Sequence, residues 1–114
     1  MLSKKYRFHS RGGIKYTYQK GRQVRTPKIS LIYAKNIKGK QRFAVIVSKK
    51  VLKSAVGRNK IRRRVYEAIR EELSAIKPPI DCLFTIYSKE IKDLDFKVLQ
   101  ETIQTLLKEA KIVV

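Results

Sequence analysis

The densest set of chemically active side chains lies in the middle of the chain, within residues 56–67. Five cations occur in residues 58–64, and four of them are arginines. A guanidinium group grips phosphate through two parallel hydrogen bonds and also stacks on nucleobases. Asn59 stands among these cations, and its amide can both donate and accept hydrogen bonds. These residue types favour recognition of a phosphate polymer.

The excess positive charge of the chain ends in this same segment. Residues 1–64 contain 21 Lys and Arg and no Asp or Glu, whereas residues 65–114 contain 7 Lys and Arg and all 9 acids. A net charge of +19 opposes compaction through self-repulsion, which indicates that the charge has a use. Nucleic acid is the expected partner, and a polybasic membrane patch is the main competitor. A membrane-surface protein needs large exposed apolar side chains, whereas the apolar faces here are expected to be internal.

Cysteine usage and the N-terminus favour a cytoplasmic protein. Cys82 is the only cysteine, so no disulfide can form within the chain, and a reducing cytosol is the simplest setting. The first residues are charged where a signal peptide needs an apolar segment of about 7 residues or more. No apolar run approaches the ~18 residues that span a bilayer, so no membrane segment is expected.

The sequence offers no set of residues typical of catalysis by the protein itself. The acids are scattered, and those of the central segment are better explained as ion pairs within a helix. His9 is the only histidine, and we expect it at the surface or on RNA, because a catalytic histidine normally acts with an orienting partner. Cys82 is expected to be buried as a small hydrophobic residue. The sequence contains no metal-ligand spacing and no phosphate-binding glycine loop.

The hydrophobic periodicity predicts one domain whose helices pack on a sheet. We expect a helix over residues 10–20, closed by Gly21, and a loop over residues 21–28. Strands over 28–35 and 41–48, joined by a short glycine-containing turn, are expected to pair as an antiparallel hairpin. The pattern further predicts a long helix over 55–76 and a strand over 80–87. A last helix follows a cap at Asp93 or Asp95, and its apolar face contains Phe96, Leu99, Ile103, Leu106, Leu107 and Ala110.

The two strands of the expected hairpin differ in bulk on their two faces. The large face should meet the main core, and it contains Ile29, Leu31, Tyr33, Phe43, Val45 and Val47. The small face is expected to line a shallow groove, and it contains Ser30, Ile32, Ala44, Ile46 and Ser48.

At about 100° per residue, the long helix separates into three sides. The core stripe contains Ile61, Val65, Ala68, Ile69 and Ile76, together with Glu72. On one flank, cations and acids can neutralise each other, and the members are Lys60, Arg64, Glu67 and Glu71. The other flank has no acid of its own and contains Asn59, Arg62, Arg63, Tyr66 and Arg70. We expect a polyanion to dock on this second flank; the alternative is a solvated basic face with Asn59 close to the helix cap.

A long motif resembles a known family. Residues 48–51, Ser-Lys-Lys-Val, followed by residues 55–63, Ala-Val-Gly-Arg-Asn-Lys-Ile-Arg-Arg, are similar to the bacterial ribonuclease P protein subunit. That family carries a V-S-K-K strand end and an A-V-x-R-N-R-x-K-R helix start. Arg7-Phe8, the helix with Ile14 and Tyr18, Gly21 and the later elements also occur in the family's order. The resemblance therefore extends over most of the chain.

The resemblance implies a fold and a function. The fold would be α+β, a two-layer α/β sandwich of the ribosomal protein S5 domain 2-like type. Its order would be α-β-β-β-α-β-α, with a left-handed βαβ crossover, and residues 1–114 would form a single RNA-binding domain. The protein would be the non-catalytic subunit of an endoribonuclease, with no catalytic residue and no metal site of its own. A catalytic RNA would remove the 5′ leader of precursor tRNA with Mg²⁺, while the protein binds the leader and lowers the demand for metal.

The resemblance also implies two sets of contact residues. The catalytic RNA would bind Arg58, Asn59, Lys60, Arg62, Arg63, Arg70, Lys49 and Lys50. The leader would lie in a cleft formed by Ile14, Tyr18, Ser30, Ile32, Ile46, Ser48 and Lys50.

This chain departs from the family at several of these positions. Lys60 replaces the second arginine of the motif, and Tyr66 replaces a later one. Ile14 and Ile32 stand where aromatics are common, and isoleucine cannot supply base stacking worth ~1–3 kcal/mol. Leader contacts are then weaker, or come from Tyr16, Tyr18 or Tyr33. The alternative function is a ribosomal or other structural RNA-binding protein without a processing role.

Overall fold

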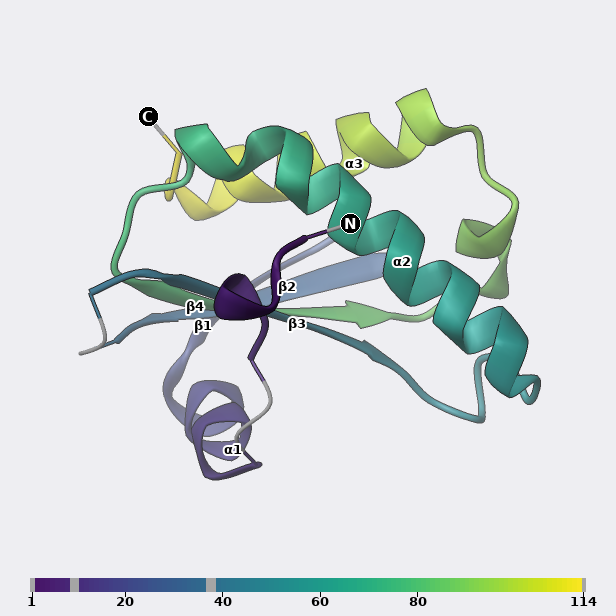
Figure 1. The fold of residues 1–114 in the computed structure, drawn as a ribbon, viewed down its shortest axis with the longest axis horizontal. Coiled ribbons are helices and arrows are strands. Elements are labelled where there is room, and N and C mark those ends of the chain that lie inside the picture. Colours follow the sequence, from purple (N-terminus) through teal and green to yellow (C-terminus); the bar gives the residue numbers. More distant parts are fainter. Residues whose placement is uncertain (1, 9–10, 37–38, 114) are drawn as a thin grey trace.

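A four-stranded sheet separates one helix from two others (Figure 1). The computed structural model describes residues 2–8, 11–36 and 39–113. The helix α1 (Arg11–Lys20) covers one face of the sheet, while α2 (Ala55–Glu72) and α3 (Phe96–Ala110) cover the other. The strands are β1 (Arg22–Arg25), β2 (Ile29–Lys35), β3 (Gln41–Val47) and β4 (Ile80–Ile86). Short 3-10 helices are η1 (Lys4–Tyr6), η2 (Leu73–Ala75) and η3 (Lys89–Lys92).

The expected hairpin of β2 and β3 is wrong, because β4 lies between the two strands in the order β1-β2-β4-β3. Leu83 of β4 stands opposite Ile32 in an antiparallel ladder and opposite Ala44 in a parallel one. Six of the seven residues of β4 are buried, which suits a central strand covered on both faces. Alternation of apolar residues identified these strands, but it carries no information about their partners.

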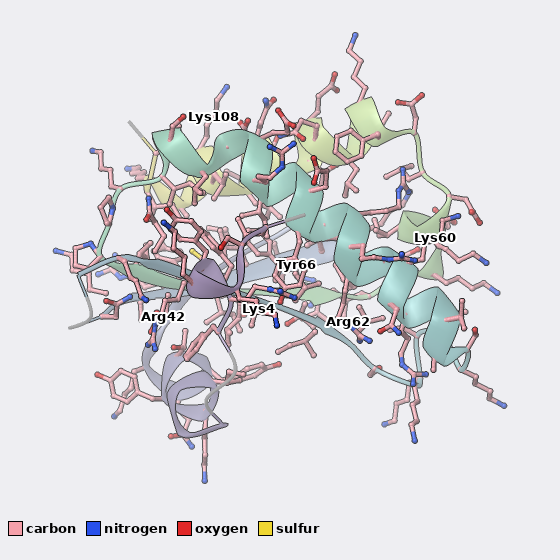
Figure 2. All side chains as sticks on the ribbon, in the orientation of Figure 1. Lys4, Arg42, Lys60, Arg62, Tyr66 and Lys108 are labelled. Atoms are coloured by element: carbon pink, nitrogen blue, oxygen red, sulfur yellow. The ribbon has the colours of Figure 1, made fainter. Side chains whose placement is uncertain are left out.

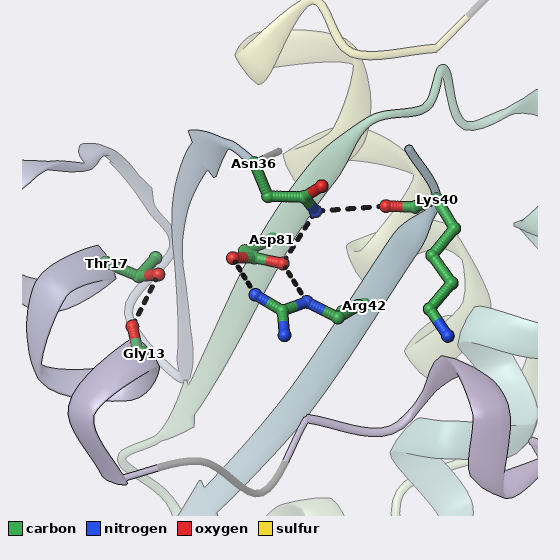
Figure 3. Close-up of polar contacts among 6 residues, drawn as sticks. All are labelled: Gly13, Thr17, Asn36, Lys40, Arg42 and Asp81. Carbon is green, nitrogen blue, oxygen red and sulfur yellow. Dashed lines mark hydrogen bonds and ion pairs between the residues drawn. The ribbon is translucent and has the colours of Figure 1, made fainter. Parts of the chain in front are cut away.

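The connection from β2 to β3 therefore passes the start of β4, and it is fastened there. The Asn36 Nδ2 group donates to the Lys40 carbonyl oxygen at 3.0 Å and to Asp81 Oδ1 at 2.8 Å (Figure 3). The backbone N–H of Ile80 also donates to the Lys40 carbonyl oxygen. These contacts hold the end of β2 and the start of β3 against the first residues of β4.

The β3–α2–β4 unit joins two neighbouring parallel strands through a left-handed crossover (Figure 1). About 98% of such connections in proteins are right-handed. The unusual hand agrees with the fold that the family resemblance implied. It places α2 above the β3 edge of the sheet, beside the N-terminal segment.

The loop expected over residues 21–28 is also wrong, because β1 pairs antiparallel with β2 there. The β1 sequence Arg-Gln-Val-Arg is exposed apart from Val24, so it gives no apolar alternation. Gly21 makes the turn from α1 into β1 possible. A Cβ atom at this position would lie 2.5 Å from the Thr17 carbonyl oxygen and 2.9 Å from that of Tyr33.

The main core lies between the sheet and the pair α2 and α3. As predicted, it contains the large face of the strands, the core stripe of α2 and the apolar face of α3, although Phe96 is exposed and Tyr33 packs only at the margin. A smaller cluster on the α1 side consists of Phe8, Ile32, Ala44 and Leu83, with Ile14 against it. Cys82 is fully buried in the main core, as expected.

The N-terminal ends of the two long helices are set by side-chain caps. Ser54 Oγ accepts a hydrogen bond from the Gly57 backbone N–H at 3.1 Å, and Asp95 Oδ1 accepts one from Lys97 at 2.8 Å. The central helix ends at Glu72, earlier than expected, and η2 carries the chain to the buried Ile76. None of the described helices is long and apolar enough to cross a membrane.

Candidate nucleic-acid interface

A groove of about 660 Å³ opens where the N-terminal half of α2 passes the β3 edge of the sheet. The helix contributes Val56, Asn59, Arg62, Arg63 and Tyr66, and the sheet contributes Ala44, Val45 and Ile46. The N-terminal segment adds Arg7 and Phe8, and α1 adds Ile14. Figure 2 shows Arg62 and Tyr66 on the side of α2 that faces the sheet. The cationic flank of the helix and the small face of the sheet thus meet in one concave surface, defined here as the α2 groove.

Arg62 and Arg63 give the α2 groove its charge. Arg62 Nη2 donates to Asn59 Oδ1, so the amide holds the guanidinium group in place. Arg63 is exposed and forms no hydrogen bond or ion pair with any residue that the structure describes. Since no described carboxylate lies within ion-pair distance of either arginine, both charges are available to phosphate.

Tyr66 forms the floor of the groove. Its side chain is buried, and its hydroxyl oxygen accepts a hydrogen bond from the Val45 backbone N–H at 3.3 Å. Burial raises the pKa of Tyr66, so the phenol stays neutral. The backbone N–H of Phe8 donates to the Phe43 carbonyl oxygen at 2.7 Å on the same strand. Tyr66 and the N-terminal segment therefore cover the β3 edge, whereas the sequence pattern had placed Tyr66 on the docking flank.

Arg70 does not belong to an acid-free flank, contrary to expectation. It forms ion pairs with Glu67 at 2.5 Å and with Glu71 at 3.0 Å, and it does not line the α2 groove. The hydrogen bond from Arg70 is the largest cause that lowers the pKa of Glu67 to about 2. The charge of Arg70 is thus largely neutralised by two carboxylates of the same helix.

The expected neutralisation of Lys60 and Arg64 by Glu67 and Glu71 is also wrong. Lys60 Nζ lies 3.3 Å from Asp93 Oδ1, so this lysine contacts the segment after β4. Arg64 donates to the backbone carbonyl oxygens of Ile91 and Leu94. Both cations therefore fasten α2 to the connection that precedes α3.

Arg58 has a structural role within the connection that leads into α2. Its Nη1 group donates to the carbonyl oxygens of Leu52 at 3.0 Å and Lys53 at 2.7 Å. Gly57 is buried, and a Cβ atom there would lie 2.5 Å from Leu52 Cδ2. The Leu52 side chain therefore packs against Gly57 in the space that a Cβ atom would occupy. Lys49 and Lys50 are exposed just after β3 and have no partner in the described structure.

The residues expected in the leader cleft occupy different environments. Ile14 and Ile46 line the α2 groove, and Ser48 is exposed at the end of β3. Ile32 is buried beneath α1, and Ser30 is buried with its hydroxyl 3.0 Å from the Tyr87 hydroxyl, so neither is accessible in this conformation.

The aromatics expected to replace the missing stacking residues also lie outside the α2 groove. Tyr18 is 53% exposed, Tyr16 is exposed, and Tyr33 is half-buried at the margin of the main core. His9, expected at the surface or on RNA, lies outside the described residues.

Aromatic–guanidinium pairs were missed by sequence reasoning. The Arg42 guanidinium lies 4.2 Å from the Phe8 ring centroid, and it binds both Asp81 oxygens at 2.7 Å (Figure 3). The Arg25 guanidinium lies 4.2 Å from the Tyr87 ring centroid, and Tyr87 is partly exposed on the same sheet face as Ile46. No local pattern reveals such pairs, because the partners come from segments that are distant in the sequence.

Arg7 also lines the α2 groove, and the sequence pattern gave it no role. Its Nε atom is buried without a hydrogen-bond partner, and its guanidinium lies 5.9 Å from the Tyr66 ring centroid. The Arg7-Phe8 pair was part of the family resemblance, which was the only signal that marked it. Arg7 adds a third cation to the α2 groove.

These features define the class of the molecule: a small, strongly basic two-layer α/β sandwich whose candidate site is a cationic groove. No group of three or more His, Cys, Asp or Glu that could hold a metal ion occurs among the described residues. Asp81 is the buried acid, and both of its oxygens are bound by Arg42.

Comparison with known proteins identifies the family to which the chain belongs. A family model described as Ribonuclease P matches residues 2–111. The ribonuclease P protein component of Chloroflexus aurantiacus is 34% identical over 109 residues, which cover 96% of this chain and 80% of the relative. That of Synechococcus elongatus is 31% identical over 118 residues, covering 98% and 95%. The chain belongs to the ribonuclease P protein family.

Solved structures agree with this assignment. The RNase P protein of Staphylococcus aureus superposes with a TM-score of 0.82 at 27% identity, covering 96% of this chain and 98% of that one. The RNase P protein of Thermotoga maritima has a TM-score of 0.80 at 24% identity over 90% and 96% of the two chains, which shows the shared fold. The two-layer sandwich and the element order implied by the resemblance are thereby confirmed.

Proposed function

We propose that this chain binds the catalytic RNA of ribonuclease P through the N-terminal half of α2, and the 5′ leader of precursor tRNA through the α2 groove. The observation that carries the proposal is the meeting of Arg62 and Arg63 with Ile14 and Ile46 in one concave surface. Cations on one wall suit the RNA backbone, and apolar side chains on the other suit unpaired bases. A single-stranded leader held there would lie beside the RNA subunit.

The charge distribution supports a division of the cations into two kinds. Arg58, Lys60 and Arg64 are engaged by carbonyl or carboxylate oxygens of the protein, and they orient α2. Arg62 and Arg63 form no ion pair with a described carboxylate, and we assign them as the main phosphate contacts. Lys49 and Lys50 extend this surface beyond the end of β3.

In this proposal the RNA performs the cleavage and binds the Mg²⁺ ions. The described acids form no cluster with metal-ligand character, so the protein's own residues are given no catalytic step. The contribution of the protein is electrostatic. Its unpaired cations neutralise phosphate repulsion between the catalytic RNA and its substrate, which free Mg²⁺ would otherwise have to screen.

Leader binding is tested by comparing precursor and mature tRNA. Ile46→Ser removes apolar surface from the α2 groove and is expected to weaken binding of precursor tRNA to the RNA–protein complex, while the affinity for mature tRNA stays the same. Val98→Ser, on an exposed α3 position outside the α2 groove, is the matched control and should change neither. Equal losses for both tRNAs with Ile46→Ser would contradict a leader site in the α2 groove.

A further inference from the structure

A second basic groove, of about 740 Å³, lies at the β1 edge of the sheet. It is lined by Tyr16 and Lys20 of α1, Arg22 of β1, Tyr33 and Lys35 of β2, and Lys111 after α3. Glu109 is the one acid among its lining residues. We propose that this β1-edge groove binds an unpaired stretch of RNA, independently of the α2 groove.

The cations of the β1-edge groove outnumber its single acid. The side chains of Lys20, Arg22, Lys35 and Lys111 form no ion pair or hydrogen bond with the described part of the chain. All four are exposed, so their charges face solvent. Four cations around one carboxylate make a surface that is complementary to a chain of phosphates.

Two tyrosines make RNA a better occupant than an acidic peptide. Tyr16 is 58% exposed, and it lies one helical turn before Lys20 on the same side of α1. Tyr33 stands directly opposite Arg22 in the β1–β2 ladder, and Lys35 follows on the same sheet face. Each ring thus has a cation beside it, which is the arrangement that binds a base together with its phosphate. The bases of a duplex are not free to stack on side chains, so the occupant is unpaired.

The backbone holds the two halves of this groove together. Gly21 lies between Lys20 and Arg22 and is packed so closely that a Cβ atom would lie 2.8 Å from Ile32 Cγ2. The end of α1 is therefore fixed against β2, which fixes the backbone positions from which Lys20 and Arg22 extend. Such preorganisation lowers the entropic cost of binding.

The β1-edge groove is separate from the α2 groove. The two share no lining residue. Ile14 lines the α2 groove and Tyr16 the β1-edge groove, and residues two apart point to different sides of a helix. The protein would thus present two RNA-contacting surfaces on either side of α1.

The absence of tryptophan from this chain allows a site-specific test. In a Tyr16→Trp variant, an oligouridylate of about 12 nucleotides is expected to quench the single tryptophan as it binds. Adding Arg22→Ala and Lys35→Ala should reduce the slope of log K against log salt by about 1.4, because two phosphate contacts are lost. The charge-matched pair Lys89→Ala and Lys97→Ala, exposed near the start of α3, should leave this slope nearly unchanged.

Two further arms make the result decisive. Arg62→Ala with Arg63→Ala in the Tyr16→Trp background should preserve the quenching, and a Phe96→Trp reporter should show none. The proposal is overturned if the Tyr16→Trp signal does not change at concentrations where fluorescence anisotropy shows the oligonucleotide bound. It is also overturned if polyglutamate quenches equally, or if only the Arg62 and Arg63 changes abolish the signal. None of these three results would contradict leader binding in the α2 groove, which the comparison of precursor and mature tRNA tests separately.

Discussion

The hydroxyl oxygen of Tyr66 accepts a hydrogen bond from the backbone N–H of Val45, and this contact joins α2 to the edge strand β3. It fixes the distance between the cations of the helix and the apolar wall of the α2 groove. Without it, a polar group of the edge strand would be buried without a partner.

Tyr66→Phe is therefore expected to lower the free energy of unfolding by about 1–3 kcal/mol, because the Val45 N–H loses its acceptor while packing is kept. Urea denaturation measures this change. Tyr18→Phe is the control, since Tyr18 is 53% exposed and its hydroxyl makes no hydrogen bond within the described part of the chain. An equal or larger loss for Tyr18→Phe would contradict the importance given to the Tyr66 contact.

The Arg42–Asp81 pair provides a second stability prediction. Its side chains are 18% and 7% exposed, so Asp81→Asn leaves a largely buried guanidinium without its carboxylate and should cost about 3–5 kcal/mol. The exposed Lys60–Asp93 pair is the comparison, and Asp93→Asn should cost less than about 1 kcal/mol. Similar midpoints of thermal unfolding for the two variants would show that burial of the Arg42–Asp81 pair does not matter.

Cys82 should behave as a protected thiol. Burial, and secondarily the nearby Asp81, raises the pKa of Cys82, so the native protein disfavours the thiolate. Below the unfolded-state pKa of about 8.5, Cys82 is a neutral thiol in both the folded and the unfolded protein. Above it, only the unfolded protein gains stability by losing the proton, so the free energy of unfolding falls as the pH rises. Cys82→Ala should therefore show a smaller fall in the free energy of unfolding above that pH. An identical pH dependence in both proteins would reject this explanation.

The division of the cations on α2 predicts different salt effects for two exposed arginines. Arg63→Ala should reduce the slope of log K against log salt for binding of the catalytic RNA by about 1. Arg70→Ala should reduce it less, because Glu67 and Glu71 already meet the charge of Arg70. Filter binding over a range of salt concentrations gives both slopes, and a larger effect of Arg70→Ala would reverse the assignment.

Sequence periodicity predicted the helices, three of the four strands and the faces that form the core. It missed β1, because Arg22, Gln23 and Arg25 are exposed on a short edge strand. It also paired β2 with β3, because local patterns do not show that β4 inserts between them.

For the site, the angular positions of residues on the long helix separated its sides, but they could not identify which segments pack beside each side. Arg58 and Arg64 bond to backbone carbonyl oxygens, and residue type gives no sign of such partners. The angular position of Arg70 indicates an open flank, but its long side chain reaches Glu67 on the neighbouring flank. Only Arg62 and Arg63 kept the open environment that the pattern indicated.

The most direct test of the account is cleavage of precursor tRNA by a bacterial ribonuclease P RNA at limiting Mg²⁺, with and without this protein. The account predicts that the protein restores removal of the 5′ leader at Mg²⁺ concentrations too low for the RNA alone. Arg62→Ala with Arg63→Ala should lose most of this effect, whereas Lys89→Ala with Lys97→Ala should retain it. Cleavage that is unchanged by the wild-type protein at limiting Mg²⁺ would contradict the central claim.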